Sequence, residues 1–247
     1  MPMALLRDQL KELVNSLLGV GGLRLVSANW GPRGFASSLK RVKRQGIFPQ
    51  TVIDIGASNG QWTRECFAIF PEARYFLVDP LMQNTPSLEK LAMQNRRIKY
   101  WRGALGSSES SLPLRMHGDQ SSLLISQEYG GDIENVSVRT LDSFLKDEWF
   151  AGPFLLKADV QGFELEVLRG ATKCLQSTEL ILLEVSFRRL YEKAPLAHEV
   201  IAYAASQGFR LYDICSYVLR PYDGELAQAD ILFAKDGSEL FRYEGWN

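Results

Sequence analysis

A carboxylate follows an apolar segment in the stretch KADVQGFELEV, which starts at Lys157. The residues before it, 154–156, predict a buried strand, and Asp159 lies where that strand should end. Burying an unpaired carboxylate costs several kcal/mol, so an acid at a strand end needs a partner, a helix start to cap or a ligand. Gly162 then allows a tight turn, and Glu164 falls in the first turn of the next predicted helix, where its charge suits the helix dipole.

A glycine turn follows the first predicted strand in the stretch VIDIGASNGQWT. Gly56 and Gly60 let the backbone approach a ligand closely, and the helix start behind them directs amide donors toward it. The spacing G-x-x-x-G differs from the dinucleotide pattern G-x-G-x-x-G, and Asp54 would repel a pyrophosphate at this turn. An ammonium group would be attracted instead. We assign to such a ligand Asp54, both glycines and the turn residues Ala57, Ser58 and Asn59.

A second acid lies about 20 residues beyond this turn, at the position where a nucleotide-binding α/β sheet holds ribose hydroxyls. This acid, Asp79, ends the predicted strand in ARYFLVDP. An acid at this position is by itself typical of a loop, but together with Asp54 and the two glycines Asp79 indicates a ribose-binding site. Gly103 and Ala104, after the third strand, are predicted to give adenine a close backbone wall. A ligand with a ribose, a cationic amine end and no pyrophosphate fits the description of S-adenosylmethionine.

The elements that must position these residues alternate between short apolar runs and helical patterns, as in a sheet covered on both faces. The segment joining the last two strands is too short for a crossover helix, so these strands should pair antiparallel. Between residues 112 and 136 the spacing of Leu112, Leu114 and Met116 predicts an extra strand, followed by a long loop over the carboxyl edge of the sheet. Strands are predicted over 51–55, 74–78, 98–102, 154–158, 180–185, 210–215 and 229–234, and helices near 61–69, 85–95, 140–147, 163–169 and 196–207.

The chain before the first strand has a different pattern. Residues 4–18 carry leucines at helical spacing, and a glycine-rich stretch ends that helix. The basic segment 40–44 is predicted to lie on a helix leading into the first strand, as a solvated face or as an electropositive rim for an anionic substrate. We therefore divide the chain into an N-terminal helical extension over 1–45 and a methyl-donor-binding domain over 46–247.

Six segments together resemble one family, the FkbM family of S-adenosylmethionine-dependent methyltransferases. They are VIDIGASNGQWT, FLVDP, GDQSSL, VRTLDSFL, LLKADVQGFELEVLRGA and LILLEVSF, within residues 50–235. The resemblance implies the α/β, Rossmann-like class I methyltransferase fold: a mostly parallel sheet in the order 3-2-1-4-5-7-6, with strand 7 antiparallel and helices on both faces. It also implies O-methylation of a hydroxyl on a saccharide or on a glycosylated or polyketide-like metabolite.

Three residues are candidates for the base that takes the proton from an acceptor hydroxyl. Asp159 is preferred because it ends the strand next to the first one, Glu184 is second, and His117 is third because imidazole suits base work near neutral pH. Glu184 could instead pair with Lys157 or an arginine. Close acids can also bind a divalent metal, but no ligand spacing is recognisable, so none is predicted. The predicted substrate-binding residues are Ser121, Ser122, Gln161, Glu164 and Arg188.

Composition narrows the class of protein further. The 247 residues are 46% hydrophobic with a formal net charge of -1, as in ordinary soluble globular proteins. Three scattered cysteines without a CxxC argue against a zinc site and a disulfide framework. No stretch reaches the roughly 18 apolar residues of a membrane span. Charged residues interrupt the apolar N-terminus, which argues against a signal peptide, so we expect a cytoplasmic protein.

Three other classes of protein are less consistent with these patterns. A Rossmann oxidoreductase is disfavoured by the missing third glycine and by Asp54. A non-catalytic S-adenosylmethionine-binding or scaffolding protein is disfavoured by the complete set of acids and glycines. A nucleic-acid methyltransferase is disfavoured by the net charge of -1 and the lack of an N/D-P-P-Y/F block. The expected partner is a small-molecule or glycan acceptor, and the N-terminal helix could form a homodimer contact or cover the sheet.

Overall fold

The computed structural model describes Val14 and residues 32–117, 121–124, 132–147, 149–243 and 245. The predicted helix over 4–18 lies outside the described residues, Val14 excepted. The chain divides into two units, Met1–Pro32 and Arg33–Asn247, and the fold that follows is that of the second. No helix within the described ranges is both long and apolar enough to cross a membrane.

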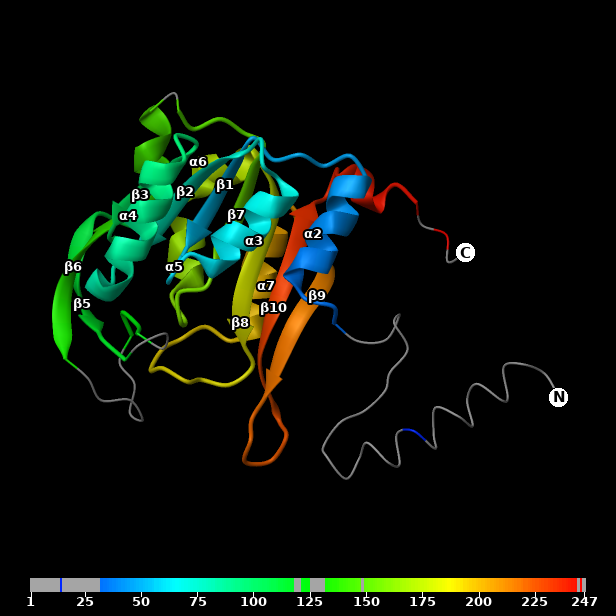
Figure 1. The fold of residues 1–247 in the computed structure, drawn as a ribbon. Helices are drawn as coiled ribbons and strands as arrows, with labels where there is room; N and C mark the ends of the chain where they lie inside the picture. The colour runs from blue at the N-terminus through cyan, green and yellow to red at the C-terminus, as the bar shows by residue number, and fades with distance from the viewer. Residues whose placement is uncertain are drawn as a thin grey trace. The chain divides into compact units, whose positions relative to one another are not determined.

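A seven-stranded sheet forms the centre of the second unit, in the order β3-β2-β1-β7-β8-β10-β9 (Figure 1). β10 runs antiparallel to both of its neighbours, and the other pairs are parallel. Numbered within this sheet, the order is 3-2-1-4-5-7-6 with the last strand reversed, so the predicted topology is confirmed. The strands are β1 (Thr51–Ile55), β2 (Arg74–Asp79), β3 (Ile98–Arg102), β7 (Phe154–Ala158), β8 (Thr178–Ser186), β9 (Phe209–Leu219) and β10 (Leu226–Lys235).

Helices cover both faces of this sheet because its strands place apolar side chains on both sides. In β1, Val52 joins one core and Ile53 joins the other. One face packs against α2, α3 and α4, which lie in front of the sheet in Figure 1, and the other against α5, α6, α7 and the 3-10 helix η2. The bounds are α2 (Phe35–Arg44), α3 (Gln61–Ile69), α4 (Thr85–Gln94), η2 (Leu141–Lys146), α5 (Glu164–Arg169), α6 (Thr172–Gln176) and α7 (Ala197–Ser206), with shorter 3-10 helices η1 (Met82–Asn84) and η3 (Glu239–Phe241).

The basic segment 40–44 lies in α2, where two of its cations are used inside the fold. Arg41 forms an ion pair with Asp213 of β9, and the Lys43 ammonium donates a hydrogen bond to the Ile69 carbonyl at the end of α3. These contacts fasten α2 to its neighbours. They leave less charge for the electropositive rim that was one interpretation of this segment.

A second, three-stranded sheet follows β3 in the chain, in the order β4-β6-β5. Its strands are β4 (Ala104–Leu105), β5 (Ser110–Arg115) and β6 (Ile133–Arg139). The predicted extra strand corresponds to β5. The predicted loop is wrong at its end, because residues 133–136 begin β6, whose alternate valines pack with the buried Leu114 of β5. The sheet therefore buries one face only, which is why alternation was its sequence signal.

Candidate active site

A cavity of about 330 Å³ opens at the carboxyl ends of β1, β2 and β7, next to the point where the strand order reverses. Open α/β sheets bind their ligands at this place. The walls combine apolar side chains with a few polar groups, as in small-molecule sites. The predicted site residues on its walls are Gly56, Ser58, Asp79, Gly103, Ala104, Ser121, Asp159 and Gln161.

The turn between β1 and α3 requires glycine at position 56. Gly56 has a φ of 74°, and a Cβ there would lie 1.9 Å from the carbonyl oxygen of Asp159. The amides of Gly56 and Ala57 donate hydrogen bonds to the Val78 carbonyl at 2.9 and 3.1 Å. The turn is thereby held against the ends of both β2 and β7. Backbone, not side chains, forms this wall of the cavity.

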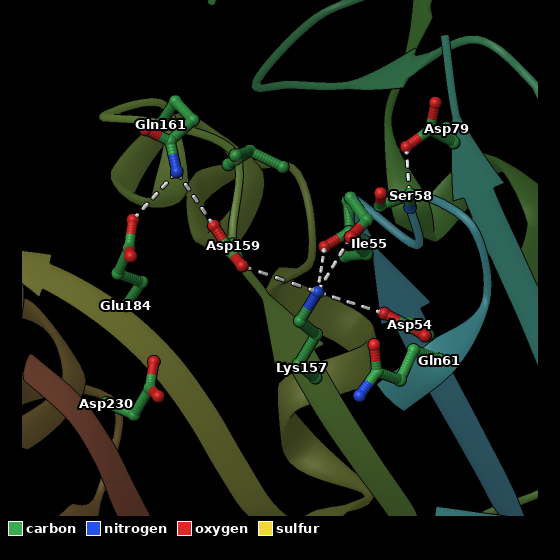
Figure 2. A network of polar contacts seen from close by, with 12 residues as sticks. Asp54, Ile55, Ser58, Gln61, Asp79, Lys157, Asp159, Gln161, Glu184 and Asp230 are labelled. Atoms are coloured by element: carbon green, nitrogen blue, oxygen red, sulfur yellow. Dashed lines mark hydrogen bonds and ion pairs between the residues drawn. The ribbon is translucent and has the colours of Figure 1, made fainter. Parts of the chain in front are cut away.

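Asp79 reaches the cavity wall with most of its hydrogen-bonding capacity already used. Its Oδ2 accepts from the Ser58 amide at 2.8 Å, and its Oδ1 accepts from the Leu81 amide and from Nδ2 of Asn84, both at 3.0 Å (Figure 2). Burial raises the pKa of Asp79, although these hydrogen bonds act in the opposite direction. A carboxylate has about four lone-pair sites, so about one is left for a ribose hydroxyl, where the sequence predicted two.

Asp54 lies beneath the turn and is 0% exposed. Its Oδ2 accepts a hydrogen bond from Thr63 at 2.6 Å, and Lys157 Nζ lies 3.1 Å from its Oδ1 (Figure 2). Asp54 and Lys157 are directly opposite each other in the β1 and β7 pairing. Burial opposes the charge of Lys157, but Asp54 and Asp159 raise the pKa of its ammonium above the ordinary value. The cation that Asp54 was expected to attract is therefore supplied by the chain itself.

Lys157 is a site residue that the sequence did not lead us to predict. Its ammonium also donates a hydrogen bond to the Gly56 carbonyl at 2.7 Å and lies 3.9 Å from Oδ2 of Asp159. It thus joins the glycine turn to the end of β7. The sequence did carry a signal for Lys157. A single cation in a strand buried on both faces requires an anionic partner on a neighbouring strand.

Asp159 and Glu184 are brought together by one side chain, that of Gln161. The Gln161 amide nitrogen lies 3.1 Å from Oδ1 of Asp159 and 3.0 Å from Oε2 of Glu184 (Figure 2). The Asp159 side chain is 39% exposed, whereas Glu184 is half-buried in β8. Of the two interpretations of Glu184, the one that groups it with Asp159 fits this geometry.

Glu184 also lies directly opposite a third acid, Asp230 of β10. Burial, followed by the charges of Asp159, Glu164 and Asp230, raises the pKa of Glu184. Burial and Asp159 likewise raise the pKa of Asp230, although Ser216 donates a hydrogen bond to it. Like charges that face each other across strands repel, so the site favours proton uptake by Glu184 near neutral pH.

A second cavity, of about 280 Å³, lies against the same glycine turn. It is lined by Trp62, by Lys157 and by two residues predicted to bind the methyl donor, Ala57 and Asn59. It shares Gly56, Ser58 and Asp159 with the first cavity. The Trp62 indole nitrogen is buried and has no hydrogen-bond acceptor within the described residues. The two cavities therefore meet at Asp159 and the turn.

The other predicted residues have less direct positions. Ser122 donates a hydrogen bond through its hydroxyl to the Gln161 carbonyl at 2.8 Å, so it supports the loop after β7. His117 is exposed, and its amide donates to the Ser121 hydroxyl at 2.8 Å. Arg188 forms an ion pair with Glu225. Gly60 begins α3 with a φ of 79°. Within the described ranges no three His, Cys, Asp or Glu side chains are grouped as metal ligands would be.

Glu164 is buried, 3% exposed, and braces the loop after β7. Its Oε1 accepts hydrogen bonds from the amides of Val160 and Gly162 at 2.9 and 3.2 Å. Burial raises the pKa of Glu164 from 4.5 to about 7, against the effect of these bonds. The ionised side chain is therefore a destabilising charge in the folded state.

Replacing Glu164 with Gln should stabilise the protein in a pH-dependent way. The folded-state pKa lies above the unfolded value, so the wild type loses stability as pH rises from 4.5 to about 7. The variant keeps an oxygen acceptor and has no such loss. Its free energy of unfolding, measured in urea, should match the wild type below pH 4.5 and exceed it by roughly 2–3 kcal/mol at pH 8. The exposed Glu89→Gln serves as control, and an equal difference at both pH values would contradict the assignment.

Comparison with known proteins agrees with this fold. A family model described as the methyltransferase FkbM domain matches residues 54–211, and no curated protein matches the sequence. The crystal structure of methyltransferase FkbM from Methylobacillus flagellatus KT is similar with a TM-score of 0.50 and 16% identity, over 81% of this chain and 48% of that one. This chain thus spans about half of that protein's length.

Two further structures are similar at lower scores. Precorrin-6y C5,15-methyltransferase from Geobacter metallireducens GS-15 has a TM-score of 0.43 and 9% identity, covering 81% of this chain and 86% of that one. M. capricolum TrmK in complex with S-adenosyl-homocysteine has a TM-score of 0.46 and 9% identity, covering 83% and 70%. The strand order and the similarity to the M. flagellatus structure identify the fold as that of a Rossmann-like methyltransferase. Because the family model covers more than half of the residues, the chain belongs to the FkbM methyltransferase family.

Proposed function

We propose that the chain is an S-adenosylmethionine-dependent O-methyltransferase whose acceptor is a hydroxyl on a saccharide or on a glycosylated or polyketide-like metabolite. The observation that supports this most is the position of Asp159. Asp54, Asp79 and Glu164 are buried and hydrogen-bonded within the fold. Asp159 has a 39% exposed side chain and lies on the walls of both cavities, so it is the acid that can meet both a methyl donor and an acceptor.

The residues of the two cavities fit S-adenosylmethionine. The first cavity has apolar walls for adenine and the remaining acceptor site of Asp79 for a ribose hydroxyl. The second is lined by Lys157, whose ammonium suits the carboxylate of the donor's amino-acid end. When bound, S-adenosylmethionine supplies a methyl group on a positively charged sulfur, and that charge is lost as an oxygen attacks.

Asp159 accepts the proton of the acceptor hydroxyl in this proposal. Its carboxylate is held between the ammonium of Lys157 and the side-chain amide of Gln161, so it needs no rearrangement before the reaction. Walls on both sides of Asp159 can align the reacting atoms, and good alignment can supply roughly 7–11 kcal/mol. Proton transfer to a positioned base contributes about 10²–10⁴-fold more.

Replacing Asp79 with Ala should weaken the binding of S-adenosylhomocysteine by at least about tenfold, because a charge-assisted hydrogen bond to the ribose is lost together with the anchor of the Ser58 amide. Isothermal titration calorimetry measures this affinity. Asp142→Ala is the matched control, since Asp142 holds the start of α6 and lies outside both cavities. Tight binding of NADH by the wild type, with none of S-adenosylhomocysteine, would contradict the proposal in favour of an oxidoreductase.

The acceptor class is tested separately, by transfer of labelled methyl groups into a panel of glycans and glycosylated metabolites. Methylation of a hydroxyl in this panel is the expected result. Donor binding without transfer to any acceptor class would point to a non-catalytic protein. Transfer to RNA in preference to the panel would contradict the acceptor proposed.

A further inference from the structure

Gln161 has a backbone and a side chain that are both fixed from outside its own loop. Its φ is 54°, in the left-handed region that residues other than glycine seldom occupy. Such a conformation persists where the surroundings determine it, often at functional sites. Here Ser122, next to the three-stranded sheet, donates its hydroxyl to the Gln161 carbonyl at 2.8 Å. The side chain is thereby aimed at the acids at the ends of β7 and β8 (Figure 2).

The Gln161 side-chain amide has two N–H groups and one oxygen, and each of the three has a hydrogen-bond partner. Its two N–H groups reach Asp159 and Glu184, at 3.1 and 3.0 Å. Its oxygen accepts a hydrogen bond from the Tyr191 hydroxyl at 3.2 Å. An amide in the reverse orientation would aim its oxygen at two carboxyl groups. The two acids therefore favour the orientation that holds Asp159, and the Tyr191 hydroxyl supports it by donating to the amide oxygen.

The Asp159 carboxylate lies between two donors that pull in different directions. Gln161 holds Oδ1 at 3.1 Å, and Lys157 lies 3.9 Å from Oδ2, beneath the glycine turn. Without the amide, the ammonium would draw the carboxylate into a closer ion pair. The carboxylate would then withdraw from the wall that the two cavities share. Gln161 and Lys157 thus set the position of this acid between them.

We propose that Gln161 is a positioning residue, which holds the Asp159 carboxylate at the junction of the two cavities, while Tyr191 anchors the oxygen of its amide. This inference rests on the function proposed above. It replaces the prediction that Gln161 binds the substrate directly. It also assigns Glu184 the role of second anchor for the amide, since both N–H groups are needed to hold it across β7 and β8.

Sinefungin tests this without knowledge of the acceptor. In this analogue of S-adenosylhomocysteine an amine-bearing carbon replaces the sulfur, so an ammonium occupies the place of the reactive methyl group. Its affinity relative to S-adenosylhomocysteine reports whether a carboxylate is held there. We expect Asp159→Asn to lower this ratio by about tenfold, and Gln161→Met to lower it by about fivefold with the affinity for S-adenosylhomocysteine unchanged.

Gln228→Met is the matched control, because Gln228 donates to the same Glu184 oxygen at 2.8 Å without contacting Asp159. Its ratio should remain that of the wild type. Tyr191→Phe should lower the ratio about twofold, and it decides the question should Gln161→Met fail to fold. An unchanged ratio in the Gln161 or Tyr191 variant, with a lowered ratio in Asp159→Asn, overturns the inference. No binding of S-adenosylhomocysteine to the wild type would instead overturn the function proposed and the inference with it.

Discussion

Replacing Lys157 with Met is expected to lower the free energy of unfolding by about 3–5 kcal/mol, because it leaves a buried charge without its partner. Asp54 is 0% exposed and would keep only the hydrogen bond from Thr63. The Gly56 carbonyl would lose its donor at the same time. Urea unfolding followed by circular dichroism measures the change. Donor binding should weaken as well, since the glycine turn would no longer be joined to β7.

A double-mutant cycle separates the charge from the shape of the side chain. Combining Asp54→Asn with Lys157→Met removes both charges and keeps a hydrogen-bond partner for Thr63, so the double variant should be more stable than Lys157→Met alone. Lys99→Met is the control, because its pair with Asp147 is exposed and contributes little to stability. A loss for Lys157→Met no larger than that for Lys99→Met would contradict the role assigned to the buried pair.

The pair of Asp54 and Lys157 shows where sequence reasoning about the site stops. Both residues interrupt apolar strands, and the predicted order places their strands side by side. Their pairing depends on the register, which matches Asp54 with Lys157. A shift of one residue would turn the two side chains to opposite faces of the sheet. Because no local feature of the sequence reports this register, Asp54 was interpreted as facing the ligand.

The fold was more accessible than the site for a related reason. β1, β3 and β7 begin and end at the predicted residues, since each is a short run with apolar or aromatic residues that glycine or an acid closes, at Gly56, Gly103 and Asp159. β6 was missed because its alternation is limited to two buried residues, Val136 and Val138, and because it lies far in the chain from its partner β5. The glycine turn could be predicted because only glycine fits at position 56, where a Cβ would lie 1.9 Å from a backbone oxygen. Hydrogen bonds between side chains, such as those of Gln161, leave no comparable pattern in the sequence.

The three-stranded sheet contributes both to the fold and to the candidate site. Leu114 of β5 and Ser121 line the first cavity, and Ser122 holds the Gln161 carbonyl. The segment predicted to lie over the carboxyl edge of the large sheet therefore does so in part as a folded sheet. Its apolar side closes the cavity, and its polar end supports the loop that carries Asp159. The cavity and Asp159 are thus positioned by the same insertion.

Replacing Asp159 with Asn is expected to reduce methyl transfer by about 10²–10⁴-fold while the affinity for S-adenosylhomocysteine changes by less than about threefold. Asn keeps the shape and an oxygen that can accept from Gln161, but it cannot take up the proton of an attacking hydroxyl. Labelled methyl transfer to the best acceptor of the panel, under single-turnover conditions, measures the chemical step, and calorimetry measures donor binding.

Two controls complete this experiment. Asp142→Asn should transfer at the wild-type rate, because that acid only holds the start of α6. Glu184→Gln should cost less than Asp159→Asn, since Gln can still accept the amide of Gln161 and the pKa of Glu184 is already raised by burial. The reverse order of the two losses would make Glu184 the base. Transfer by Asp159→Asn at nearly the wild-type rate would show that Asp159 takes no part in the chemical step, because removing the hydroxyl proton is the role proposed for its carboxylate.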